Sequence, residues 1–183
     1  LSAGDAFSVQ SLRDLQMWCN LAWCGGECPI VGIELFTGED ASVRRLVQQG
    51  RIFSREDIDA MIEEQYKIMR AVIPLHCALQ DRGQIEVSTT PFYHPILPLL
   101  IDTDRATIDR PGAVHPDRFA FPKDAEAQVA SAVEKYEEWF GRAPRGMWPA
   151  EGAVSQSSIP FFADNDVSWI ATDQGVLTQS GQW

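Results

Sequence analysis

The 183-residue sequence has no long apolar run, no basic cluster and only three histidines. Its apolar runs fall short of the roughly 20 residues that a membrane-spanning helix needs, and no signal-peptide pattern opens the chain. Acidic residues outnumber basic ones by 26 to 15, and the longest basic run is the pair Arg44 and Arg45. Such a surface repels nucleic acid and anionic membranes. We therefore expect a cytoplasmic protein with a neutral ligand and neither nucleic-acid nor membrane partners.

The sequence also lacks the paired ligands of a metal centre. Three of its cysteines are clustered and the fourth is alone beside one histidine; the four are Cys19, Cys24, Cys28 and Cys77. A structural zinc site needs two ligand pairs at short spacing. We expect reduced thiols, no disulfide, no metal and no cofactor.

What the sequence does contain is a set of amphipathic stretches that predict helices. The longest covers residues 54–79, with apolar side chains every three or four positions, a capping-box pattern at Ser54 and Asp57, and a kink expected at Pro74. Two more are expected at 8–22 and at 125–140, the second ending at Gly141. Length and a 45% hydrophobic content fit one globular domain.

Short β-type segments at 84–89, 146–150 and 167–172 follow the helical stretches. This alternation predicts an α/β fold with parallel strands, in which ligands bind where strands end. Glu86, Glu151 and Asp173 occupy or adjoin such ends, and we expect the carboxylates of Glu86 and Glu151 to face one cavity. The Pro-rich stretches 94–104 and 110–124 are expected to form long surface loops.

Taken singly, these residues also fit structural roles, which the pattern slightly favours. Glu151 suits the first turn of a helix near 155–163, and Glu86 suits a solvent-facing strand position. His94 lies in a Pro-rich loop, where a backbone-bonded histidine is common, and Asp173 is as suited to starting a turn as to binding a ligand.

Taken together, the motifs are specific. The stretches "GQIEVSTTPFYHPILPLL", "GMWPAEGAVS" and "WIATDQGVL" closely resemble the catalytic domain of glycoside hydrolase family 57, which comprises retaining α-glucan enzymes, amylopullulanase-like members included. "FSVQSLRDLQMWCNLAW" and "LVQQGRIFSREDIDAMIEEQYKIM" resemble the same group, so the resemblance covers essentially the whole chain.

This resemblance implies part of a (β/α)7-type barrel, a distorted relative of the TIM barrel, that acts on α-glucan by hydrolysis or transglycosylation. Glu151 corresponds to the nucleophile. Glu86 corresponds to an acid lining the subsite of the scissile sugar, and Trp148 is placed to offer an apolar ring face to a pyranose. His94 and Asp173 correspond to substrate-binding positions near the pocket.

Two parts of the family pattern do not occur in the sequence. No "HQP" motif is present, and the motif that carries the family's acid/base Asp comes later than Trp183. We therefore expect residues 1–183 to be one internal segment of the barrel, inactive without the remainder of the parent domain.

Two other function classes are weighed against this one. A polysaccharide deacetylase-like barrel would need clustered His and Asp ligands, and no HxxxH spacing occurs. A non-catalytic carbohydrate-binding module is the other alternative.

Overall fold

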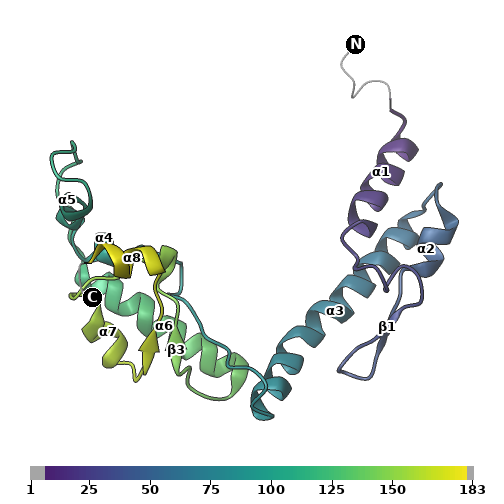
Figure 1. Cartoon of the computed structure of the whole chain (residues 1–183). Coiled ribbons are helices and arrows are strands. Elements are labelled where there is room, and N and C mark those ends of the chain that lie inside the picture. Colours follow the sequence, from purple (N-terminus) through teal and green to yellow (C-terminus); the bar gives the residue numbers. More distant parts are fainter. Residues whose placement is uncertain (1–6, 181–183) are drawn as a thin grey trace. The chain divides into compact units, whose positions relative to one another are not determined.

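The computed structural model describes residues 7–180, which form a helix-rich α/β protein divided into two compact units, Leu1–Arg82 and Gly83–Trp183 (Figure 1). The sequence gives no obvious boundary, but the division follows the end of the longest helix, where Gly83 has a positive φ of 67°. Within residues 7–180, no helix is both long and apolar enough to cross a bilayer.

The first unit is built on the predicted long helix, α3 (Arg55–Asp81), which continues through Pro74. Its capping box is confirmed: the Asp57 N–H donates to Ser54 Oγ at 3.1 Å, and the Ser54 N–H donates to Asp57 Oδ2 at 2.9 Å. This backbone bond, followed by one from the Gln49 side chain, holds the pKa of Asp57 well below its usual range. The helix start is therefore a strong local signal.

Two helices and a pair of strands pack on α3. The predicted helix α1 (Val9–Leu21) and the short α2 (Arg44–Gln49) bury a core with α3 that contains Met17, Leu21, Leu46, Phe53 and Met61. An antiparallel pair of strands, β1 (Ile33–Glu34) and β2 (Asp40–Ala41), joins them. Burying each large apolar side chain contributes roughly 1.5–3 kcal/mol, which makes this core the main source of the unit's stability.

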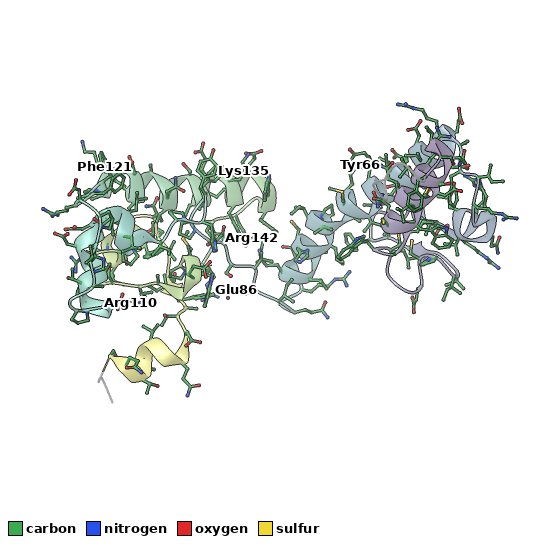
Figure 2. All side chains as sticks on the ribbon, turned by 90° about the horizontal axis from the view of Figure 1, so that it is seen from above. Tyr66, Glu86, Arg110, Phe121, Lys135 and Arg142 are labelled. Atoms are coloured by element: carbon green, nitrogen blue, oxygen red, sulfur yellow. The ribbon has the colours of Figure 1, made fainter. Side chains whose placement is uncertain are left out.

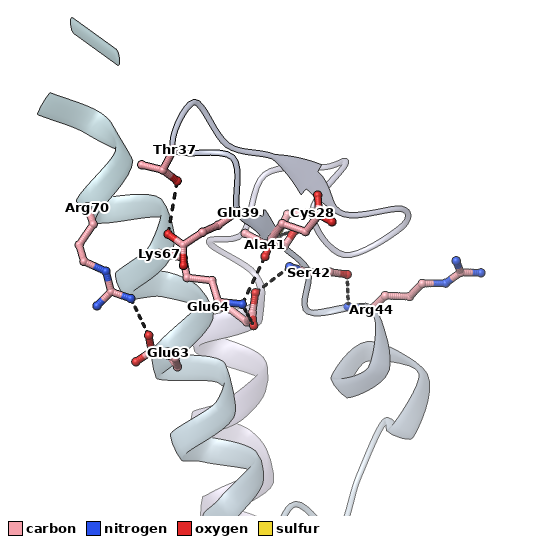
Figure 3. Close-up of polar contacts among 11 residues, drawn as sticks. Cys28, Thr37, Glu39, Ala41, Ser42, Arg44, Glu63, Glu64, Lys67 and Arg70 are labelled. Carbon is pink, nitrogen blue, oxygen red and sulfur yellow. Dashed lines mark hydrogen bonds and ion pairs between the residues drawn. The ribbon is translucent and has the colours of Figure 1, made fainter. Parts of the chain in front are cut away.

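Polar contacts fasten the β1–β2 pair to α3 (Figure 3). The Ser42 N–H donates to Glu64 Oε2 at 2.8 Å, and Lys67 Nζ donates to the Asp40 carbonyl at 3.2 Å while pairing with Glu64 at 2.7 Å. One Glu–Lys pair on the helix thus satisfies backbone groups that the two short strands leave open.

The second unit contains the other predicted long helix, α6 (Pro122–Phe140), which ends at the left-handed Gly141 as expected. Its buried face contacts α4 (Leu97–Ile101) and α7 (Ile159–Ala163), and Met147 of the sheet fills the same core. The remaining helices are a 3-10 turn at Thr103–Arg105, α5 (Ala106–Asp109) and α8 (Gln174–Gln179). Figure 2 labels Phe121 just before α6, Lys135 within it and Arg142 after it.

Two of the three predicted strands are confirmed, although each is only two residues long. β3 (Gly146–Met147) and β4 (Trp169–Ile170) are parallel, with Gly146 opposite Trp169 and Met147 opposite Ile170. A single parallel bridge adds Thr89 beside Met147.

The predicted strand at 84–89 is wrong except for that bridge. The reason is that a side chain takes the place of a strand partner at Val87, whose carbonyl accepts from the Tyr136 hydroxyl at 2.8 Å. The backbone bonds to the sheet are made by Thr89: its N–H donates to the Gly146 carbonyl, and its carbonyl accepts from the Trp148 N–H.

The expectation of a loop alone is also wrong for residues 94–104, because α4 forms there. Pro98 lies in the first turn of α4. Backbone N–H groups in a first turn have no hydrogen-bond partner within the helix, so a proline there loses no bond.

Candidate active site

The carboxyl ends of the parallel segments bring together four of the five predicted site residues. His94 follows the Thr89 bridge, Glu151 follows β3, and Asp173 follows β4. Since parallel strands all end at one edge of a sheet, this is the edge where α/β proteins bind ligands.

Glu151 sits at the middle of a tight 3-10 turn, Ala150–Gly152, between two buried neighbours. Its backbone is left-handed (φ 57°, ψ 19°), and its side chain is 69% exposed. The helix that could have made Glu151 a first-turn acid begins only at Ile159, so this structural alternative does not apply. A left-handed glutamate costs about 1–2 kcal/mol, which the buried flanking residues must offset.

The Glu151 carboxylate lies against His94. The distance from His94 Nε2 to Glu151 Oε1 is 3.4 Å, close enough for an ion pair when the imidazole is protonated. On the other side of the ring, Nδ1 lies 3.2 Å from the Thr90 hydroxyl. When Thr90 donates to Nδ1, Nε2 carries the proton and points it at the carboxylate.

His94 is itself left-handed, with φ 57°. The residues other than glycine with positive φ in the described chain are Ile52, His94, Glu151 and Asp166, so two of the four meet at this contact. Strained backbone of this kind concentrates at functional sites, because the surrounding packing maintains it for a purpose other than stability.

Trp148 lies over the Glu151 turn. A Cβ added to Gly152 would stand 3.3 Å from Trp148 Cη2 and 3.5 Å from the backbone nitrogen of Asp173. The missing side chain at Gly152 therefore lets the indole and the end of β4 approach the turn that carries the carboxylate. The indole is 39% exposed and so keeps surface available for a ligand.

Asp173 and its neighbour connect β4 to the same turn. The Asp173 carboxylate caps α8 by accepting from the Gly175 N–H at 2.6 Å. The Thr172 hydroxyl donates to the Gly152 carbonyl at 2.6 Å. Sequence reasoning missed Thr172 and Thr90, although both stand inside the motifs that carry the family resemblance.

Glu86 does not join this group, and the expectation that it shares a cavity with Glu151 is wrong. Its Oε1 accepts from Trp169 Nε1 at 2.7 Å, and its Oε2 lies 3.4 Å from Arg145. Arg145 precedes β3 and Trp169 begins β4, so both partners mark the amino ends of the strands. Glu86, which Figure 2 labels, lies ahead of the Thr89 bridge and thus on the amino side of the sheet.

Residues 10–182 match the sequence model of glycosyl hydrolase family 57. The chain belongs to this family. Alpha-amylase 1 of Dictyoglomus thermophilum is 27% identical to it over 96 residues, which are 52% of this chain and 11% of that protein. The family member described here therefore spans about a tenth of its curated relative.

Solved structures are also similar. The α-amylase AmyC of Thermotoga maritima is 19% identical, with a TM-score of 0.46, over 93% of this chain and 27% of that one. A branching enzyme of Thermococcus kodakaraensis is 19% identical, with a TM-score of 0.44, over 69% of this chain and 24% of that one.

Among the described residues, this family 57 chain holds no group of three or more His, Cys, Asp and Glu side chains arranged for a metal ion. Its four cysteines all lie within residues 7–180 and form no disulfide. What the site offers chemically is the exposed carboxylate of Glu151 with an imidazole directed at it, a second exposed carboxylate on Asp173 and one indole face.

Proposed function

We propose that the protein is a retaining, α-glucan-active enzyme in which Glu151 is the nucleophile, and that residues 1–183 are one segment of a (β/α)7-type barrel completed by the remainder of the parent domain. The observation that carries the proposal is that Glu151, after the carboxyl end of β3, has a left-handed backbone and an exposed carboxylate in contact with His94. Substrate would be an α-1,4- or α-1,6-linked glucan, cleaved by hydrolysis or passed on by transglycosylation.

Each site residue then has a definite task. Glu151 attacks the anomeric carbon and forms a covalent glycosyl-enzyme. Trp148 packs an apolar ring face against the sugar, and His94 contacts substrate while its Nε2–H orients the Glu151 carboxylate. Asp173 contacts substrate beside them. Glu86 remains a predicted substrate contact from family resemblance, and it is the one member of the set whose contacts with Arg145 and Trp169 separate it from the others.

Retaining cleavage needs a second carboxylic acid about 5–5.5 Å from the nucleophile, to protonate the leaving oxygen. The family resemblance places this acid in a motif beyond those in residues 1–183. Loss of general acid catalysis costs about 10²- to 10⁴-fold. We therefore expect residues 1–183 alone to release no detectable product from maltoheptaose, whereas the complete parent domain turns it over with retention of anomeric configuration.

The nucleophile is tested by substitution in the parent domain. Glu151→Gln should abolish turnover followed by NMR of the product anomers, whereas Glu137→Gln, an exposed carboxylate on α6, should leave it intact. Full activity of Glu151→Gln would refute the assignment. An inert wild-type domain that still binds maltoheptaose would instead favour the carbohydrate-binding alternative.

A direct test avoids the need for the acid. A fluorinated glucosyl fluoride carries a leaving group that departs without protonation, and its fluorine substituent slows breakdown of the glycosyl-enzyme. Incubation with the parent domain should add one sugar mass to the peptide that contains Glu151. Labelling of any other peptide would show that a different residue is the nucleophile.

A further inference from the structure

A cavity of the Gly83–Trp183 unit lies on α6, and none of the residues that line it is assigned to catalysis. Its volume is about 260 Å³, and it is lined by Phe92, Ser131, Glu134, Lys135 and Glu138. Ligand pockets for drug-sized molecules occupy roughly 300–1,000 Å³, so this one suits a smaller group, the size of one sugar ring.

The aromatic wall of this cavity is held in place by α6. The Phe92 N–H donates to the Gln128 carbonyl at 3.0 Å, and the Tyr93 N–H donates to Gln128 Oε1 at 2.8 Å. The Phe92 and Tyr93 rings meet edge to face, with their centroids 4.7 Å apart. Because Gln128 fixes both backbone positions, Phe92 presents a preorganised apolar surface, of which 39% is exposed.

The opposite wall is polar. Lys135, labelled in Figure 2, pairs with Glu138 and lies 5.9 Å from the ring centroid of Trp139. The exposed Glu134 carboxylate and the Ser131 hydroxyl complete the lining. Two carboxylates against one ammonium disfavour an anionic ligand, whereas carboxylates and a hydroxyl accept hydrogen bonds from a neutral polyol.

We propose that this cavity is a second glucan-binding subsite, which holds one glucose residue with its apolar face on Phe92 and its hydroxyls on Glu134 and Ser131. The choice of an α-glucan as ligand rests on the proposed function. Aromatic rings combine a large apolar contact area with the flat shape that a pyranose face requires.

The subsite is connected to the candidate active site through one turn. The His94 N–H donates to the Pro91 carbonyl at 2.8 Å, which closes a β-turn that contains Phe92. A sugar bound against Phe92 therefore stabilises the turn that also holds His94 in its left-handed conformation.

Binding of maltotetraose to the 183-residue chain, ¹⁵N-labelled, tests the proposal. Titration should shift the backbone amides of Ser131 and Glu134, and Phe92→Ala and Glu134→Gln should each weaken this response at least fivefold. Glu137→Gln on the same helix, outside the cavity, is the matched control and should bind like the wild type. Circular dichroism establishes whether each variant is folded. If Phe92→Ala is unfolded, the binding of Glu134→Gln alone tests the subsite.

Unshifted Ser131 and Glu134 amides in the wild type, or undiminished binding by folded Glu134→Gln, would overturn the subsite. These results are independent of catalysis, because the titration reads the cavity alone. Labelling of Glu151 without sugar binding in the cavity would refute the subsite and keep the proposed function. Cavity binding without labelling of Glu151 would keep the subsite as a sugar site and refute the nucleophile.

Discussion

Gly146→Ala should destabilise the second unit far more than an ordinary glycine substitution. Gly146 opens β3, and a Cβ added there would stand 1.9 Å from Trp169 Cε2 and 2.0 Å from Cζ2, far inside contact distance. The indole lies flat on the glycine and cannot stay there above an alanine. Overpacking costs typically 1–3 kcal/mol.

Moving the Trp169 ring out of the way of the new methyl group also costs a hydrogen bond. Trp169 Nε1 donates to Glu86 Oε1 at 2.7 Å, and this bond breaks when the ring swings away. A hydrogen bond to a charged group is worth about 1.5–3 kcal/mol when buried, and less here because the Trp169 and Glu86 side chains are both more than a third exposed. We expect a combined loss of about 2–3 kcal/mol in the free energy of unfolding, or a Tm lower by roughly 10 °C for a unit of this size.

Urea unfolding followed by far-ultraviolet circular dichroism measures the loss, and a double-mutant cycle identifies its cause. In a Trp169→Ala background the steric conflict is gone, so adding Gly146→Ala should cost less than about 1 kcal/mol. An equal cost in both backgrounds would refute the reasoning, because the strain would then come from the backbone of β3 and not from the indole.

Two further predictions concern other parts of the same unit. Gly152→Ala should cost about 1–2 kcal/mol in a thermal melt because φ is +64° and the new methyl would press on Trp148, and its turnover in the parent domain should fall; an unchanged melt would contradict this. The Arg118 guanidinium, and then the Asp104 N–H, lower the pKa of Asp102 from 3.8 to about 2, so the stability that the Arg118–Asp102 pair contributes is present above pH 4 and is lost as the pH falls through 2. Arg118→Ala should therefore reduce the loss of stability on acidification, measured by urea unfolding at several pH values. A pH profile identical to that of the wild type would contradict the assignment.

Sequence patterns predicted the elements whose stability is local. The α3 helix carries its own start signal at Ser54, and α6 its own stop at Gly141, so apolar spacing and end residues were sufficient. The segment at 84–89 failed for the opposite reason. This segment is held by side chains distant in sequence: Tyr136 bonds Val87 from 49 residues away, and Trp169 bonds Glu86 from 83 residues away. No local sequence pattern encodes these contacts.

The candidate site was likewise predictable in part. Its composition was predictable, because Glu151, His94, Trp148 and Asp173 stand in long motifs that resemble one family. Its geometry was not, because the contact of His94 with Glu151 depends on left-handed φ angles, which are uncommon for residues other than glycine. The Asp173 carboxylate, weighed as a ligand or a turn former, caps α8.

The long separations between partners in the second unit also bear on how quickly it forms. Its helices can form early, but the Thr172 to Gly152 bond spans 20 residues, Tyr136 to Val87 spans 49, and Trp169 to Glu86 spans 83. Closing such loops is entropically costly before any contact repays it, so parallel pairing is slow. We therefore expect the turn that carries Glu151 to reach its left-handed conformation late in folding, after Thr172 has come to its bond with the Gly152 carbonyl.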